Sequence, residues 1–149
     1  MKNSRKGFTL VELLIVIVVI GVLSTMMMLS STEAVTSAKA SNIVSNLRNM
    51  KTAALAWYAD NLSTAEGDGF SLASYESQIA KYMSNEGIGN YHFVGGQNAG
   101  TWFVYVAETD ARVMAKLVSR KSAVGLYAIS NNKSADLTAS SGNVGMFIR

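Results

Sequence analysis

The sequence predicts an α+β fold, in which one long N-terminal α-helix packs on a small antiparallel β-sheet of about four strands. An uninterrupted apolar run occupies residues 8–29. Residues 30–61 contain neither glycine nor proline, so the helix is expected to continue through them. Short apolar runs separated by polar or glycine-rich segments follow in the second half of the chain. Helix and strands in separate stretches of one chain are typical of the α+β class.

The apolar run reads FTLVELLIVIVVIGVLSTMMML and is long enough to cross a membrane. As a helix, its 22 residues extend over about 33 Å, and the hydrocarbon core of a bilayer is about 30 Å thick. Lys2, Arg5 and Lys6 precede the run. Positive charges stay on the cytoplasmic side, so the N-terminus is expected in the cytoplasm and the rest of the chain outside.

Two other interpretations of the run are a secretory signal and a plain single-span anchor. A secretory signal has a shorter apolar stretch, followed closely by an A-x-A-like cleavage site. The triplet Ala38-Lys39-Ala40 lies well beyond the end of the run, which disfavours a secretory signal. A plain anchor explains the length and the orientation equally well.

Glu12 distinguishes the run from a plain anchor, because it is a carboxylate inside an apolar segment. A charged side chain within hydrocarbon costs a few kcal/mol, so an ionisable residue there is a candidate for function. The alternative is that Glu12 lies near the membrane edge and extends its carboxylate toward water.

The segment from Lys6 to Leu13, KGFTLVEL, resembles the processing site of type IV prepilins and pseudopilins. The resemblance implies that a prepilin peptidase removes residues 1–7 by cutting after Gly7, and that it methylates the new N-terminus at Phe8. It also implies that Glu12, at the fifth mature position, pairs with the N-terminal ammonium group of Phe8 on a neighbouring subunit. Residues 8–29 then form a transmembrane and filament-core helix, and residues 30–149 a pilin domain.

One feature departs from this family. Gly21 stands where the family commonly has a helix-loosening glycine, but many pilins also carry a proline near the position of Leu29, and this chain has no proline. Whether the core helix melts between these two positions therefore stays open. Ser24 and Thr25 are poorer helix formers than alanine and weaken the same segment.

The second half of the long helix has an apolar stripe. Its members are spaced by four, three, four and three residues: Ile43, Leu47, Met50, Ala54 and Trp57, widened by Val44, Leu55 and Tyr58. The opposite face is polar: Lys39, Asn42, Asn46, Arg48 and Lys51. Such an amphipathic helix packs its stripe on a globular core. The segment 65–69, which contains two glycines, is expected to end the helix.

The remaining elements are short. Residues 71–84 are predicted to form a second helix, and 109–120 a third that Thr109 caps. Strands are predicted at 91–94, 101–106, 123–129 and 144–148, with a hairpin loop at 95–100 and a polar loop at 131–143.

The charges are unevenly distributed. The net charge of +3 comes from the leader, because the rest of the chain has ten basic and ten acidic residues. Residues 8–108 carry −4 and residues 109–149 carry +4. This asymmetry predicts either solvated charges of no consequence or a charge match between identical subunits.

Arg112, Lys116 and Arg120 are four residues apart, so they share one helix face, with Lys121 alongside. The face is either solvated, or in contact with an acidic neighbouring subunit, or in contact with DNA or another polyanion. The net charge of zero after the leader does not support a nucleic-acid partner.

Enzymatic chemistry is not expected. The chain has no cysteine and only one histidine, His92, which excludes a disulfide and disfavours a zinc site. No nucleophile or orienting partner accompanies His92, so no catalytic site and no cofactor are predicted. Asp136 is a minor candidate for a calcium ligand. Asn61 and Asn132 each start an N-x-S triplet, which is the glycosylation acceptor pattern.

The sequence therefore predicts a structural subunit of a type IV pilus or pilus-like filament. Its expected partners are further copies of itself, the prepilin peptidase and the pilus assembly machinery of the inner membrane. The subunit is expected in the inner membrane before assembly and in an extracellular pilus afterwards. Three alternatives stay open: a pseudopilin of a type II secretion system, a DNA-binding minor pilin, and a membrane-anchored binding domain that does not polymerise.

Overall fold

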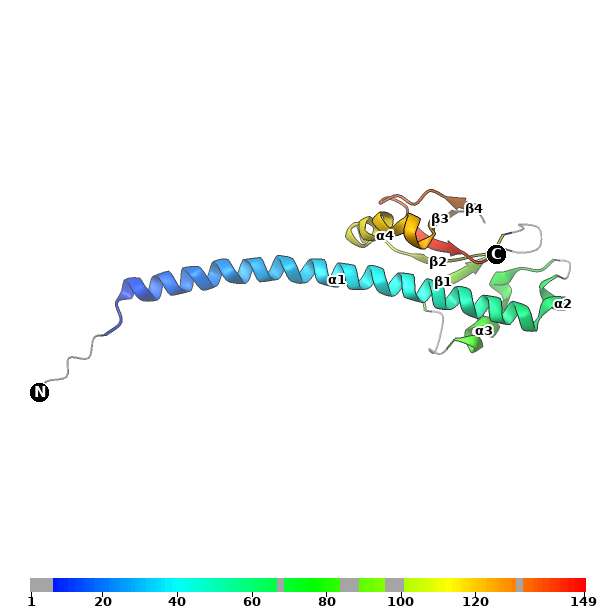
Figure 1. Ribbon diagram of the computed structural model, residues 1–149, viewed down its shortest axis with the longest axis horizontal. Helices are drawn as coiled ribbons and strands as arrows, with labels where there is room; N and C mark the ends of the chain where they lie inside the picture. The colour runs from blue at the N-terminus through cyan, green and yellow to red at the C-terminus, as the bar shows by residue number, and fades with distance from the viewer. Residues whose placement is uncertain (1–6, 67–68, 84–88, 96–100, 131–132) are drawn as a thin grey trace, which may run out of the picture. The chain divides into compact units, whose positions relative to one another are not determined.

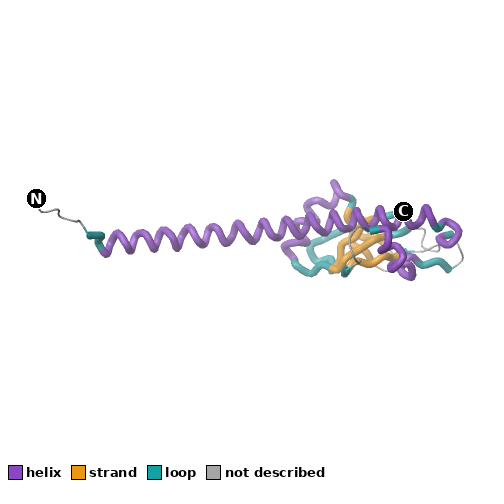
Figure 2. Tube along the Cα trace, turned by 90° about the horizontal axis from the view of Figure 1, so that it is seen from below, coloured by secondary structure: helices purple, strands orange, loops and turns teal. Residues whose placement is uncertain are grey.

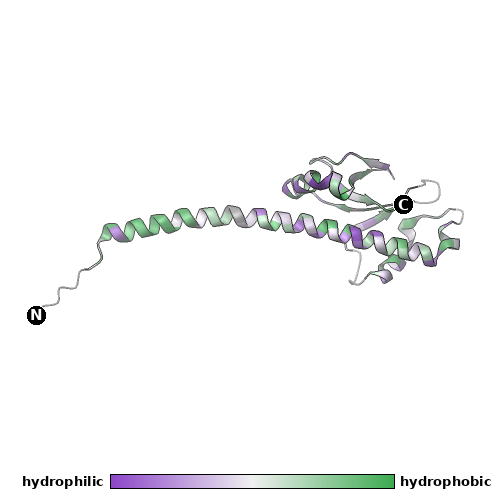
Figure 3. Ribbon diagram, viewed as in Figure 1, coloured by the Kyte–Doolittle hydropathy of each residue, from purple (hydrophilic) through white to green (hydrophobic). Residues whose placement is uncertain are grey.

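The computed structural model describes residues 7–66, 69–83, 89–95, 101–130 and 133–149. The chain forms two compact units, Met1–Val35 and Thr36–Arg149. Helix α1, Leu10–Asp60, is 51 residues long and runs through both of them. Figure 1 shows this helix in blue to green, and Figure 3 shows that its first half is the more uniformly hydrophobic one.

The first unit exposes its apolar side chains. From Leu10 to Leu23, the large hydrophobic residues are 50–79% exposed. They occur on all sides of the helix, and a helix that is hydrophobic all round is normally buried in a large protein or in a membrane. By length and composition, α1 is the one helix in the described part of the chain that is able to cross a membrane.

The second half of α1 buries the predicted stripe. Leu47, Met50 and Ala54 are fully buried, and Ile43 and Trp57 are nearly so. Leu55, in contrast, is 38% exposed, so its assignment to the stripe was wrong. Val44 lies on the same side of α1 three turns earlier, is buried, and lines a groove with Val124 of another helix. A helix face is buried only where another element covers it.

Helix α1 ends one turn earlier than predicted. Asn61 leaves the helical conformation, with φ −127° and ψ 37°, and its side-chain Nδ2 donates to the carbonyl oxygen of Trp57 at 2.9 Å. Asparagine competes with the helical backbone for hydrogen bonds, which explains the break. A single turn, α2, Leu62–Ala65, follows.

The predicted helix at 71–84 is three short pieces in the described residues. These are the 3₁₀ turn η1, Leu72–Tyr75, the helix α3, Glu76–Ile79, and the 3₁₀ turn η2, Ala80–Tyr82. Leu72 and Ile79 are fully buried. This segment therefore packs by two apolar anchors and not by a regular helical stripe.

The sheet has five antiparallel strands in the order β1-β2-β5-β3-β4. They are β1, Tyr91–Val94, β2, Phe103–Ala107, β3, Leu126–Ser130, β4, Lys133–Ala135, and β5, Asn143–Phe147. Strand β4 lies inside the segment predicted as a polar loop. Its three residues are all exposed, so it has no alternation of buried and exposed positions that reveals a strand. The predicted hairpin between β1 and β2 is present, and most of its loop lies outside the described residues.

Helix α4, Ala111–Val124, connects β2 to β3. Its N-cap is Asp110 and not Thr109, because Oδ1 of Asp110 accepts from the backbone N–H of Arg112 at 2.9 Å. Gly125 ends the helix in the left-handed conformation, with φ 73°. This extends the helix beyond the predicted end and moves the start of β3 to Leu126.

One core lies between α1, α4 and the inner face of the sheet. Its largest fully buried residues include Trp57, Phe93, Leu47, Met114 and Val144. At one end, Trp57, Phe70, Tyr75 and Trp102 form a cluster of aromatic rings. The guanidinium group of Arg149 lies 4.3 Å from the centre of the Tyr58 ring and holds the last residue against α1. Figure 2 shows the strands against the second half of α1. The predicted α+β fold is confirmed, with five strands in place of about four.

Candidate processing and assembly sites

The N-terminus of α1 is closed by a reciprocal hydrogen-bonded turn. Oε2 of Glu12 accepts from both the backbone N–H and the hydroxyl of Thr9, each at 2.8 Å. The N–H of Glu12 points back to the Thr9 hydroxyl oxygen at 3.2 Å. This is a capping box, which satisfies donors that the first turn of a helix leaves without partners. The backbone amide of Thr9 persists if the chain is cut before Phe8, so this hydrogen bond does not depend on the leader.

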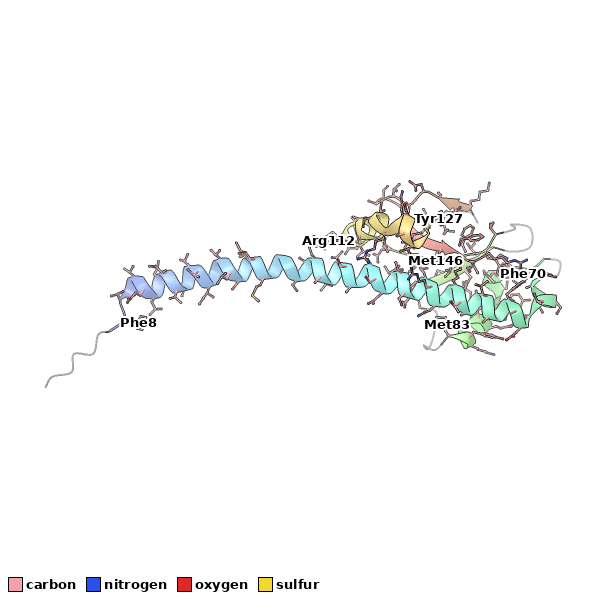
Figure 4. All side chains as sticks on the ribbon, in the orientation of Figure 1. Phe8, Phe70, Met83, Arg112, Tyr127 and Met146 are labelled. Carbon is pink, nitrogen blue, oxygen red and sulfur yellow. The ribbon has the colours of Figure 1, made fainter. Side chains whose placement is uncertain are left out.

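Phe8 directly precedes this turn and is 85% exposed. Figure 4 shows it at the start of the helix. Gly7 is also exposed, and among the described residues beyond its chain neighbours no atom lies within 4 Å of a Cβ built at its position. The structure therefore brings Phe8 and Glu12 to the same helix end. Thr9 had no assigned role in the sequence prediction. The pattern Thr-x-x-Glu before an apolar run is the signal that identifies it.

Two hydroxyl groups around Gly21 bond to the backbone of their own helix. Ser24 Oγ donates to the Ile20 carbonyl at 2.8 Å, and Thr25 Oγ1 donates to the Val22 carbonyl at 2.7 Å. Both hydroxyls are thereby satisfied without water, as an apolar environment requires. Such bonds also bend helices slightly. That this segment loosens the helix stays a prediction.

The predicted basic row lies on α4, but its members have different partners. Arg112 Nε lies 3.7 Å from Asp110 Oδ1. Lys121 Nζ donates to both oxygens of Asp136, at 2.6 and 2.8 Å. Arg120 Nη1 donates to the Ser41 hydroxyl of α1 at 2.9 Å, while Lys116 is half-buried. The row is therefore not a uniform cationic face.

Near the end of this row, a groove opens between α1 and α4. Its lining combines apolar, hydroxyl, amide and guanidinium groups: Ser41, Val44, Ser45, Arg48, Asn49, Arg120 and Val124. Two arginines from separate helices thus share one groove. The spacing within α4 did not predict this pair, because Arg48 is on a distant part of the sequence.

His92, Asp136 and Asn61, the minor site candidates from the sequence, each contact other residues of the chain. Nδ1 of His92 lies 3.8 Å from Oε1 of Glu76, which also accepts from the Phe93 N–H. Asp136 is engaged by Lys121. Within the described ranges, no group of three or more potential ligands is placed to hold a metal. The Asn61 amide is half-buried and bonded to Trp57, and Asn132 lies outside the described residues.

Comparison with protein families identifies the N-terminal segment. Residues 2–28 match the model of the prokaryotic N-terminal methylation motif. Among solved structures, the chain is similar to the major type IV pilin PilA1 from Clostridium difficile, with a TM-score of 0.51 and 18% sequence identity. The match covers 78% of this chain and 98% of that one. The chain carries a prepilin methylation motif on a type IV pilin fold. A comparison with curated proteins finds no match.

The predicted resemblance to type IV prepilins is confirmed by these two findings, one of which concerns a sequence motif and the other the fold. The motif covers the leader and most of the apolar half of α1, whereas the structural likeness concerns the arrangement of the long helix and the sheet. A prepilin motif with an exposed apolar helix fits insertion into a membrane followed by assembly into a pilus.

Proposed function

We propose that this chain is a structural subunit of a type IV pilus or pilus-like filament. The observation that carries the proposal is the exposed apolar half of α1, which follows a methylation motif. Its large apolar side chains are at least half exposed among the described residues, so in this proposal they contact lipid before assembly and other subunits afterwards. Removal of apolar surface from water contributes about 25 cal/mol per Å². When neighbouring helices replace lipid around this half of α1, its apolar surface stays out of contact with water before and after assembly.

Processing is the first step. A prepilin peptidase cuts between Gly7 and Phe8 and methylates Phe8, and the match to the methylation motif supports this assignment. Mass spectrometry of subunits in isolated filaments is expected to give an N-terminus at Phe8. Replacement of Gly7 by leucine is expected to leave the uncut chain in the membrane. A wild-type filament subunit that starts at Met1 would show that the proposal is wrong.

Glu12 then guides assembly. Cleavage creates an ammonium group on Phe8 at the start of an apolar helix, where an unpaired charge is costly. Oε2 of Glu12 is held by Thr9, so the carboxylate has a defined orientation when a neighbouring subunit arrives. Pairing of Phe8 with Glu12 of that neighbour offsets both charges, and a subunit at the wrong height leaves both unpaired. The apolar faces provide most of the attraction, and the pair selects the register.

The three basic residues before the helix support an orientation with the N-terminus in the cytoplasm and residues 36–149 outside. Before assembly the subunit is a single-span protein of the inner membrane, where the assembly machinery extracts it. After assembly it is part of an extracellular filament. Electron microscopy of a deletion strain tests this proposal, because loss of surface filaments supports a pilus, whereas loss of protein secretion with unchanged surface filaments supports a secretion pseudopilus.

A further inference from the structure

The groove between α1 and α4 contains two cations that have no carboxylate partner in the described part of the chain. Arg112 and Lys121 each lie beside an acidic residue of their own chain. Arg120 donates to the hydroxyl of Ser41. Among the described residues, neither Arg120 nor Arg48 forms an ion pair with an acid. The groove therefore brings together two guanidinium groups, from α1 and α4, that are available to an acid from outside this copy of the chain.

The composition of the groove matches a carboxylate. A guanidinium group presents a planar set of N–H donors that pairs with two carboxylate oxygens at once. Ser45 and Asn49 line the same groove beside Arg48 and provide further donors. Ser41 fixes the position of Arg120, so this guanidinium is oriented before a ligand binds.

The chain carries a complementary acidic group at the end of the same helix. Asp60 is the last residue of α1 and is exposed. Its Oδ2 accepts from the Tyr82 hydroxyl at 2.9 Å, and this hydrogen bond raises the pKa of the Tyr82 phenol. The bond also holds the carboxylate in place at the helix end. Glu66 adds a second exposed acid just beyond it.

Arg48 and Asp60 are too far apart to meet within one copy. They are separated by twelve residues of continuous helix, which is about 18 Å along the axis. Their charges are complementary, but the surfaces that carry them are different and lie at different heights on α1. Pairing between copies is then heterologous, and a heterologous contact that does not close into a ring continues as an open filament.

We propose that the α1–α4 groove, with Arg48 and Arg120, receives the acidic end of α1, with Asp60, from a second copy of this chain. The proposal rests on the proposed function, since it names the surface through which the globular units of a filament dock. Exposed ion pairs have small effects individually and weaken with salt. The groove therefore sets the register between globular units, and the apolar half of α1 provides the main attraction.

Disulfide trapping tests the contact in full-length chains, because the natural sequence has no cysteine. Ser45→Cys places a thiol in the groove, and Ala56→Cys places one a helical turn before Asp60 on the same face. Within one copy these positions are about 16 Å apart along the helix, beyond the reach of a disulfide. Oxidised filaments of the double variant are expected to give a ladder of covalent multimers, and each single variant none longer than a dimer. Filaments that form normally without a ladder would overturn the proposal.

A charge exchange gives an independent test of the same contact. Arg48→Asp and Asp60→Arg are each expected to lower filament yield at low salt by about threefold, the size of an exposed ion-pair effect. The two changes in one chain are expected to restore the yield, and the distance between them excludes a rescue within one copy. Lys133→Glu, on the edge strand β4, is the matched control and is expected to leave the yield unchanged.

The outcomes separate the competing explanations. If Arg48→Asp leaves assembly intact but removes salt-sensitive binding of duplex DNA by the full-length chain, the groove binds a polyanion and the proposal is wrong. Failure of the double exchange to restore the yield, in a chain that keeps its wild-type melting temperature, overturns it as well. Absence of filaments from the wild-type chain would overturn the proposed function itself.

Discussion

The two halves of helix α1 use apolar residues in opposite ways. Leu14, in the first half, is 52% exposed, whereas Leu47, in the second half, is fully buried. The first half is apolar around its whole circumference, so a single sheet is unable to cover it. The second half has one apolar stripe, which one sheet and one helix cover. The comparison shows that the second half is covered by its own chain, whereas the described residues leave the apolar side chains of the first half exposed.

Two glycines, Gly21 in the first half of α1 and Gly145 in the sheet, differ in the space around them in the same way. Apart from its chain neighbours and the backbone of its own helix turn, a Cβ at Gly21 meets no atom of the described residues within 4 Å. A Cβ at Gly145, in the central strand β5, lies 2.5 Å from Ile129 Cγ1 and 2.6 Å from the Val104 carbonyl oxygen. The first glycine affects only the helix that contains it, and the second is required by the packing of three strands.

The largest expected effect comes from Glu12 in the first half. Glu12→Ala is expected to lower filament yield by about tenfold or more, because an unpaired charge in an apolar core costs several kcal/mol. Leader cleavage and membrane insertion are expected to be unchanged. The measurement is filament yield, together with the N-terminus of the membrane-bound subunit. Glu33→Gln, an acid of α1 beyond the apolar run, is the control. Normal yield from filaments shown to contain the Glu12→Ala subunit would remove Glu12 from the mechanism.

A pair of leucine variants tests the difference between the halves directly. Leu47→Ala is expected to lower the free energy of unfolding of the globular unit by about 2–5 kcal/mol, because it leaves a cavity in the core. Leu14→Ala is expected to leave that free energy unchanged and to weaken filaments. Chemical denaturation of the full-length subunit in detergent measures the first effect, and filament yield the second. Equal loss of stability in both variants would contradict the division.

The two glycines provide a smaller contrast. Gly145→Ala is expected to destabilise the globular unit by about 1–3 kcal/mol, because the backbone carbonyl that it meets is unable to move aside. Gly21→Ala is expected to stabilise the helix by up to about 1 kcal/mol through higher helix propensity, without a change in the melting temperature of the globular unit. Circular dichroism during thermal unfolding distinguishes them. If Gly145→Ala is tolerated without a change in melting temperature, the close packing around β5 is disproved.

The smallest expected effect concerns Asp110 at the start of α4. The hydrogen bond from the Arg112 backbone N–H lowers the pKa of this carboxyl group in the folded state. Its stabilising contribution is therefore present above the unfolded pKa of about 3.9 and is lost as the pH falls through the folded value. Asp110→Ala is expected to lower the melting temperature slightly at neutral pH, and the difference from wild type is expected to disappear in acid. Asp110→Asn, which caps without titrating, is expected to keep most of its stability at both pH values. A difference in melting temperature between wild type and Asp110→Ala that persists in strong acid would contradict the ionic cap.

Much of the fold follows from local patterns. The spacing of Leu47, Met50 and Trp57 predicts the buried face of α1, and the alternating runs predict the positions of β1 and β2. The interior break at Asn61 and the edge strand β4 were missed. A helix break made by one side chain has no periodic signal, and a short exposed edge strand has no alternation.

The candidate sites also differ in whether local sequence patterns predict them. The segment Gly7–Glu12 is contiguous, so its motif is visible in the sequence. The Thr9–Glu12 capping box was also accessible, because both residues lie within one helical turn. In the basic row, Arg112 lies beside Asp110 and Lys121 beside Asp136, whereas Arg120 donates to Ser41 of α1. Its neighbour Arg48 comes from an element more than seventy positions away along the chain.

The sequence by itself determined the presence of a long helix, its division into an all-round apolar half and an amphipathic half, and the residues at which processing is proposed. These properties depend on spacing within a few helical turns, which the order of residues specifies directly. The tertiary structure alone decided which side chains of the amphipathic half are covered, where β4 joins the sheet, and which cations keep a carboxylate of their own. Those properties depend on elements that are distant in sequence and adjacent in space, and local spacing carries no information about such contacts.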